Sequence, residues 1–168
     1  MFEKGDYIVY GTTGVCQIED ITTMDPLQTG TGRLFYVLVP SSQKGGKIFT
    51  PTDRTKNYMR KVLNHDEAEQ LIREIPDIKE LWIANEKQRE DLYKTCMKSS
   101  DCRQWIRIIK TLYLRKLQRN AQGKRITAVD EKYLRMAEDC LYSELSAALG
   151  LPKEQMADYI GERIEELK

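Results

Sequence analysis

One early segment decides the fold of the first part of the chain: residues 5–21, GDYIVYGTTGVCQIEDI. The run Tyr7–Tyr10 is β-branched and aromatic, which favours a strand. Glycines follow it and favour a turn. Beyond the turn, Val15 and either Ile18 or Ile21 can face a core from a second strand. The segment therefore predicts two short strands joined by a turn.

Three further strands are predicted downstream. Leu34–Val39 is almost continuously apolar and is expected to be the best-buried strand of the set. Lys47–Thr50 is expected to be a strand that Pro51 ends, and Tyr58–Val62 can close the sheet. Loops at residues 24–32 and 40–46, rich in turn-forming residues, separate these strands. Five short strands at this spacing predict a small, strongly bent β-barrel.

The remainder of the chain shows the periodicity of helices. The composition changes near Asn64, where Asn64 or Asp66 can cap a short helix over Glu67–Glu74. Further helices are predicted over residues 76–98, with Pro76 in the first turn, over 102–121, over 128–149 after the capping pair Thr127 and Asp130, and from Pro152 onward. The fold class is therefore α+β, with a strand-rich domain at 1–63 and a domain of about four to five helices at 64–168.

Positive charge is concentrated in one part of the chain. Residues 76–126 hold thirteen Lys/Arg against six Asp/Glu, whereas the formal net charge of the whole chain is +1. Both tryptophans, Trp82 and Trp105, lie in this segment. Basic helices that carry a large aromatic side chain suit contact with phosphates and insertion between bases. On charge alone, an ordinary solvated helix face explains the pattern equally well.

The motif Gly5-Asp6-Tyr7-Ile8-Val9-Tyr10, with Gly14, Val15 and Ile18 after it, resembles the opening of the CarD/CdnL family of bacterial transcription regulators. Residues 48–51, IFTP, are similar to that family's strand before a proline. The resemblance covers essentially the whole chain. It implies a Tudor-like first domain that docks on the β subunit of bacterial RNA polymerase. It also implies a helical domain that contacts promoter DNA at the upstream edge of the transcription bubble and stabilises the open complex.

The resemblance also implies which residues contact the polymerase: Met24, Lys47, Ile48, Phe49 and Thr50. Met24 and Phe49 correspond to arginines of some members, so the docking surface is expected to be more apolar here. An exposed edge strand over 47–50 could pair with a polymerase strand through main-chain hydrogen bonds. The alternative is that Ile48 and Phe49 simply alternate between core and surface.

For the DNA contact, the resemblance implies Trp82 as a wedge at the melted junction. Packing of Trp82 in the core is the alternative, while the rival Trp105 lies in a more apolar context. The other predicted DNA-contacting residues are basic and would add salt-sensitive, largely sequence-independent affinity: Lys87, Arg89, Lys94, Lys124, Arg125 and Lys132. Free N–H groups at the helix start near Thr127 suit phosphate binding. Basic side chains of the helix predicted over 102–121 could pair with carboxylates at 86–91 and so not be free: Arg103, Arg107, Lys110, Arg115, Lys116 and Arg119.

Other function classes find little support in the sequence. No catalytic motif is recognisable, and His65 is the only histidine, so we expect no enzyme, no metal site, no cofactor and no small-molecule substrate. The four cysteines are scattered, which predicts reduced, part-buried thiols: Cys16, Cys96, Cys102 and Cys140. No apolar run approaches the roughly 20 residues of a membrane span, so a cytoplasmic protein is expected, associated with the nucleoid through RNA polymerase. The second hypothesis is a protein-only adaptor whose barrel pairs with a strand and whose basic helices bind an acidic partner.

Overall fold

The computed structural model describes residues 2–24, 30, 32–41, 46–53 and 59–166. The chain divides into two compact units, Met1–Val62 and Leu63–Lys168, called unit 1 and unit 2 below. Most of the two predicted loops at 24–32 and 40–46 lies outside the described residues, as does Tyr58. The two units are described separately.

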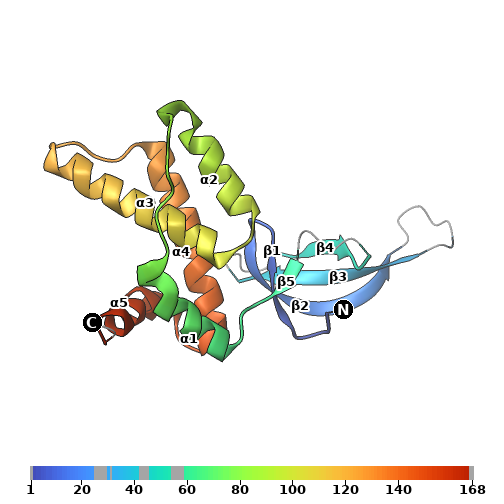
Figure 1. The fold of residues 1–168 in the computed structure, drawn as a ribbon. Helices are drawn as coiled ribbons and strands as arrows, with labels where there is room; N and C mark the ends of the chain where they lie inside the picture. Colours follow the sequence, from blue (N-terminus) through green and yellow to red (C-terminus); the bar gives the residue numbers. More distant parts are fainter. Residues whose placement is uncertain (1, 25–29, 31, 42–45, 54–58, 167–168) are drawn as a thin grey trace. The chain divides into compact units, whose positions relative to one another are not determined.

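Unit 1 is a five-stranded antiparallel sheet in the order β4-β3-β2-β1-β5 (Figure 1). Its strands are β1 (Tyr7–Tyr10), β2 (Gly14–Met24), β3 (Arg33–Pro40), β4 (Ile48–Pro51) and β5 (Met59–Lys61). All five predicted strands therefore form, although β2 is longer than expected. The pairing of β2 with β3 shifts register between Ile18 and Asp20. Such an irregularity bends a strand and increases its twist, and β2 is strongly curved (Figure 1).

One face of the sheet closes over a small core. Its buried members are Ile8, Cys16, Ile18, Tyr36, Leu38 and Met59. Leu34–Val39 was expected to be the best-buried strand, yet its first residue, Leu34, is 49% exposed. Leu34 pairs with Thr23, near the end of β2, whereas β1 pairs only with the other end of β2, at Gly14–Gln17. The end of β3 that contains Leu34 thus extends beyond the strands that cover the middle of β3.

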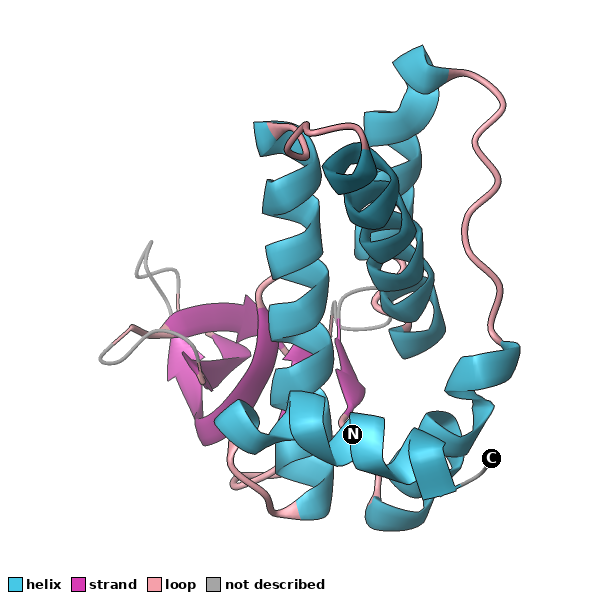
Figure 2. Cartoon of the chain, turned by 90° about the vertical axis from the view of Figure 1, so that its left-hand side faces the viewer, coloured by secondary structure: helices cyan, strands magenta, loops and turns pink. Residues whose placement is uncertain are grey.

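Unit 2 is helical. Its α-helices are α1 (His65–Glu74), α2 (Arg89–Lys98), α3 (Cys102–Ala121), α4 (Ala128–Leu149) and α5 (Met156–Glu166), with 3-10 turns η1 (Ile75–Asp77), η2 (Glu86–Gln88) and η3 (Lys153–Gln155) (Figures 1 and 2). The α+β class is confirmed. In the described part of the chain, no helix combines the length and the apolar character that crossing a membrane would require.

Local capping explains several helix ends. Asn64 accepts a hydrogen bond from the Glu67 N–H, and the Glu67 side chain accepts one in return from the Asn64 N–H, so α1 begins with a capping box. Thr127 accepts from the Asp130 N–H at the start of α4. At the end of α4, Gly150 takes φ +69°, the left-handed conformation that glycine adopts without steric cost.

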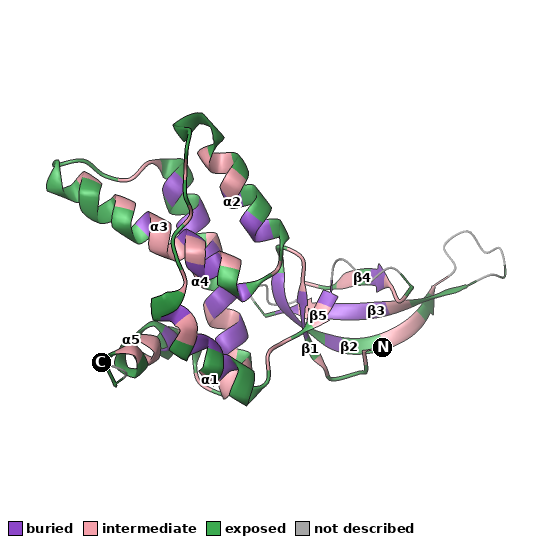
Figure 3. Ribbon diagram, viewed as in Figure 1, coloured by how far each residue is buried: buried purple, intermediate pink, exposed green. Residues whose placement is uncertain are grey.

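The core of unit 2 forms where α3 packs on α4. Trp105, Ile108, Leu112 and Leu145 are completely buried there, which explains why Trp105 cannot meet a ligand. The helix α3 does not bury its apolar side chains over its whole length. Its C-terminal half is instead largely exposed, with Leu117 65% exposed (Figure 3).

The prediction of one helix over 76–98 is wrong. Pro76 lies in η1, and the chain then runs without helical structure through residues 78–85 before η2 and α2 begin. The apolar repeat of this segment is interrupted by the charged run at 86–91, so a continuous helix would bury little. Asn85 starts a new turn by accepting a hydrogen bond from the Lys87 N–H. Side chains of α3 bond the backbone of 78–85 in place of helical hydrogen bonds, as described next.

Candidate nucleic-acid interface

The most exposed large apolar side chain of the described residues is Trp82, at 82%. It lies in the non-helical segment 78–85, called the strap below, which spans the distance between η1 and η2 (Figure 2). The alternative that Trp82 packs in the core is therefore wrong. A tryptophan this exposed gains little from folding, so packing within unit 2 does not account for its position on the surface.

Three side chains of α3 hold the first half of the strap. The Leu81 N–H donates to Thr111 Oγ1 at 2.8 Å. Lys110 Nζ donates to the Ile78 carbonyl, and Arg107 Nε donates to the Lys79 carbonyl at 3.3 Å. The strap is thus fixed to a rigid helix up to the residue before Trp82.

A cluster of four charges holds the far end of the strap. Glu86, in η2, pairs with Arg89 and, at 3.3 Å, with Arg115. Both arginines also reach Asp130 of α4, with Arg89 Nε 3.0 Å from Oδ1 and Arg115 Nε 2.8 Å from Oδ2. The Asp130 side chain is 0% exposed. The cluster therefore ties η2, α2, α3 and α4 together at one buried carboxylate.

The electrostatics of this cluster favour the charged forms of Glu86 and Arg89. The hydrogen bond from Arg89, together with the charges of both arginines, holds the pKa of Glu86 below its usual range. Burial opposes the charge on Arg89, but the hydrogen bond to Glu86 and the charge of Asp130 raise its pKa overall. Burial, and then the neighbouring Asp130 carboxylate, raise the pKa of Tyr93. A buried Asp130 is stable here because two guanidinium groups compensate its charge.

Arg89, one of the predicted DNA contacts, is engaged within unit 2. Its side chain is only 13% exposed and is engaged by Glu86 and Asp130. The expectation that some basic residues of the helix 102–121 pair with carboxylates at 86–91 is confirmed for Arg115, which lies 3.3 Å from Glu86. The sequence assigned Asp130 only to a capping pair, and no pattern in the sequence singles it out as the centre of an ion cluster.

The other predicted basic residues fall into three places. Lys87 is exposed in η2, five residues after Trp82. Lys94 lies 3.7 Å from Glu90, which also accepts a hydrogen bond from the Tyr133 hydroxyl at 3.3 Å. Lys132 Nζ lies 5.4 Å from the centre of the Tyr133 ring, so Lys94 and Lys132 flank the same tyrosine.

Lys124 and Arg125 are exposed in the turn between α3 and α4. Arg119 Nε donates to the Arg125 carbonyl at 2.7 Å and fixes the backbone of this turn. Arg125 also lines a hollow with Lys116 and Arg135. The turn forms a basic group of its own on unit 2.

Next to the strap lies an open groove of about 440 Å³. It is lined by Pro76, Ile78, Lys79 and Glu80 on one side and by Ile109, Lys110, Tyr113 and Leu114 of α3 on the other. The groove lies between the first part of the strap and the exposed half of α3. Apolar surface therefore continues from the strap onto α3.

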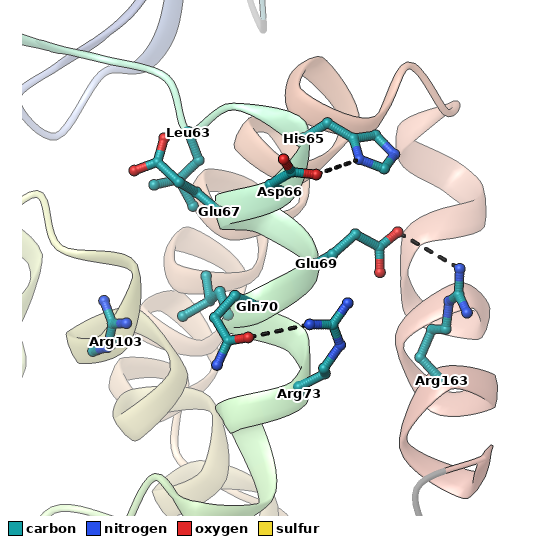
Figure 4. A pocket seen from close by; sticks show the side chains of 10 residues that line it. Leu63, His65, Asp66, Glu67, Glu69, Gln70, Arg73, Arg103 and Arg163 are labelled. Atoms are coloured by element: carbon teal, nitrogen blue, oxygen red, sulfur yellow. Dashed lines mark hydrogen bonds and ion pairs between the residues drawn. The ribbon is translucent and has the colours of Figure 1, made fainter.

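A second hollow on unit 2 lies between α1 and α5 (Figure 4). Its arginines already have partners: Arg73 donates to Gln70 at 3.1 Å, and Arg163 lies 3.6 Å from Glu69. Arg103 pairs with Glu74 at 2.6 Å. We interpret this hollow as the packing of α1 against α5, since Arg103 and Arg163 pair with carboxylates and Arg73 bonds an amide within the unit.

The predicted polymerase-contacting residues lie on two different strands of unit 1. Ile48, Phe49 and Thr50 belong to β4, an edge strand of the sheet, whereas Met24 ends β2. Phe49 is 49% exposed, while Thr50 is buried and Ile48 packs partly against the core. The alternation of Ile48 and Phe49 between core and surface is thus present. Such alternation is compatible with main-chain pairing along the edge of β4.

Lys47, the remaining predicted polymerase contact, has an acidic partner within unit 1: its Nζ lies 3.1 Å from Glu19.

Among the described residues, no three side chains of His, Cys, Asp or Glu gather in a way that could hold a metal ion. All four cysteines are buried and none forms a disulfide, as expected for reduced thiols, and Cys102 Sγ donates to Glu144 Oε1 at 3.0 Å.

Comparison with known families agrees with the resemblance noted from the sequence. Residues 2–63 match the family model described as CarD-like/TRCF RID domain, and residues 76–161 match the model described as CarD, C-terminal domain. The chain belongs to the CarD/CdnL family. The first match corresponds to unit 1, and the second match lies within unit 2. No individual curated protein matches the sequence.

Membership of the CarD family carries a general function. Its domains are those of RNA polymerase-interacting transcription factors, which are regulators and not enzymes. Within this CarD chain, the strap lies inside the match to the C-terminal domain, and β4 lies inside the match to the polymerase-interacting domain. The candidate interface therefore has two parts, one on each unit.

Proposed function

We propose that this CarD family protein binds the β subunit of bacterial RNA polymerase through unit 1 and contacts promoter DNA through unit 2. The DNA contact lies near the upstream edge of the transcription bubble, and it stabilises the open complex. The single observation that supports the DNA contact is the 82% exposure of Trp82 on a strap that α3 holds in place.

An exposed indole on a fixed backbone suits insertion at a melted junction. Apolar wedges enter between base steps that are already partly unstacked, where the cost of separating the bases is lowest. Stacking of an aromatic side chain on a base contributes ~1–3 kcal/mol and tolerates any base. The contact would therefore stabilise opened DNA with little sequence preference.

Basic residues near the strap add affinity for the phosphates. Lys87, Lys94 and Lys132 are exposed on η2, α2 and α4, and Lys124 with Arg125 form the separate basic turn. Contacts with phosphates position a protein on DNA without reading its sequence. Because the polymerase would hold unit 1 close to the promoter, weak intrinsic DNA binding by unit 2 is sufficient.

Docking on the polymerase would use the edge of β4. An edge strand offers unpaired main-chain groups to a strand of another protein. Phe49, 49% exposed on β4, adds apolar area to that contact. Met24 lies outside this edge, at the end of β2, and would extend the docking surface along the sheet.

The test is the lifetime of the open promoter complex formed by the cognate polymerase, with wild type, with Trp82→Ala and without the protein. We expect wild type to lengthen the lifetime, and Trp82→Ala to lose roughly a 5- to 150-fold factor. The matched control is Leu117→Ala, which truncates another exposed apolar side chain of unit 2, 65% exposed on α3. It should leave the lifetime unchanged.

Binding of each variant to the polymerase is measured in parallel. If wild type and Trp82→Ala both bind polymerase and neither changes the lifetime, the wedge is refuted. In that case the protein-only adaptor, whose helical unit binds an acidic partner, becomes the better explanation.

A further inference from the structure

The position of Trp82 has to be set by its neighbours. Its side chain is 82% exposed and so makes few contacts with the rest of unit 2. A non-helical segment of this length would lose substantial conformational entropy on adopting one conformation. Unless other groups hold the strap, the indole would sample many positions, and insertion into DNA would have to select one of them.

We propose that Thr111 is a positioning residue for Trp82, an inference that rests on the proposed role of Trp82 as a wedge. Thr111 Oγ1 donates to the Arg107 carbonyl at 2.6 Å and accepts the Leu81 N–H at 2.8 Å. The donated bond fixes the hydroxyl hydrogen toward the helix. A lone pair of Oγ1 is thereby directed at the strap, one residue before the indole.

Thr111 is better suited to this role than the two cations beside it. Lys110 and Arg107 bond the Ile78 and Lys79 carbonyls, farther from Trp82, through long side chains with many rotamers. A threonine is β-branched and has a restricted χ1. Its position in the middle of the 20-residue helix α3 places the acceptor on a rigid element.

Three variants distinguish the effect of the Thr111 hydroxyl group from the effect of the shape of the Thr111 side chain. Thr111→Val keeps the volume but leaves the Leu81 N–H without its acceptor. Thr111→Ser restores the hydroxyl. The matched control is Thr95→Val on α2, because Thr95 Oγ1 donates to the Asp91 carbonyl at 2.9 Å in the same intrahelical pattern. Thr95 lies on a different helix from the three strap anchors.

The first readout observes the strap directly. The chain has two tryptophans, so labelling with 5-fluorotryptophan gives two fluorine resonances, one from Trp82 and one from Trp105. Trp105 is completely buried and reports on the fold of unit 2. We expect Thr111→Val to change the shift and line width of the Trp82 resonance only. Thr111→Ser and Thr95→Val should leave both resonances as in wild type. An unchanged Trp82 resonance in Thr111→Val would overturn the proposal.

The second readout is the open-complex lifetime. Thr111→Val should shorten it by on the order of threefold to tenfold, the effect of one lost hydrogen bond, and Thr111→Ser should restore it. In the Trp82→Ala background the same substitution should have no further effect, because Thr111 acts through the indole. An equal loss in both backgrounds would show a general structural role and refute the inference.

The two readouts also separate this inference from the proposed function. If Trp82→Ala itself leaves the lifetime unchanged, the wedge fails, and the fluorine spectra alone decide whether Thr111 orders the strap. If Trp82→Ala shortens the lifetime while Thr111→Val does not, the wedge stands and Thr111 is refuted as its positioning residue.

Discussion

Replacement of Asp130 by asparagine should destabilise unit 2 more than any substitution at the exposed end of the same ion cluster. Asparagine keeps the shape of the side chain and removes its charge. Arg89 and Arg115, whose side chains are 13% and 23% exposed, would then share only Glu86, which is 65% exposed. Removal of one partner from a buried ion pair costs about 3–5 kcal/mol, because the remaining charge stays desolvated. Exposed pairs contribute about 1 kcal/mol or less.

The control is therefore Glu86→Gln. It removes the charge of the other carboxylate in the cluster, which is exposed to solvent. Urea unfolding at pH 7, followed by tryptophan fluorescence, reports on unit 2 because both tryptophans lie in it. We expect a loss of about 3–5 kcal/mol for Asp130→Asn and of about 1 kcal/mol or less for Glu86→Gln. Equal losses for the two variants would refute the argument that burial of Asp130 makes the cluster costly to break.

Three further outcomes are expected. Trp105→Ala should cost about 3–5 kcal/mol in urea unfolding, whereas Trp82→Ala should change stability by less than about 0.5 kcal/mol; equal costs would contradict their different burial. Gly150→Ala should lower the melting temperature of unit 2, because the positive φ costs about 1 kcal/mol of stability. Gly161→Ala, in the interior of α5 with open space at the added Cβ, should raise the melting temperature, since alanine stabilises a helix by about 0.5–1 kcal/mol relative to glycine. Burial raises the pKa of the Cys140 thiol from 9.0 to about 11, so the unfolded chain releases this proton first and stability should fall as pH rises through that range. Cys140→Ala should make the plot of unfolding free energy against pH less steep between pH 9.0 and about 11, and an unchanged slope would refute this assignment.

Features set by neighbouring residues were predictable from the sequence. The strand Tyr7–Tyr10 and the helix Cys102–Ala121 have the predicted bounds, because alternation, capping residues and glycine stops are local signals. Asn64 caps α1, and Gly150 ends α4, for the same reason. The family resemblance rested on such local motifs as well.

Features that depend on distant partners were not predictable. Residues 76–98 have an acceptable helical composition, but Thr111, thirty residues after Leu81, bonds the backbone in an extended form. Arg89 was expected to face solvent because it lies in a charged run, whereas Asp130, forty-one residues later in the sequence, draws it inward. The exposure of Leu34 was not predictable, because the apolar run does not show how far the neighbouring strands extend.

The strand order of unit 1 has a consequence for how the protein folds during synthesis. β1 to β4 form successive antiparallel neighbours, but β1 also pairs with β5, where Tyr10 meets Met59. A long loop has to close before this last pairing forms, which slows folding relative to the local hairpins. The nascent chain should hold a four-stranded meander with one side of β1 open until residues 59–61 leave the ribosome. Since Met59 belongs to the core of the sheet, unit 1 becomes stable only at that point, while the helices of unit 2 are still being translated.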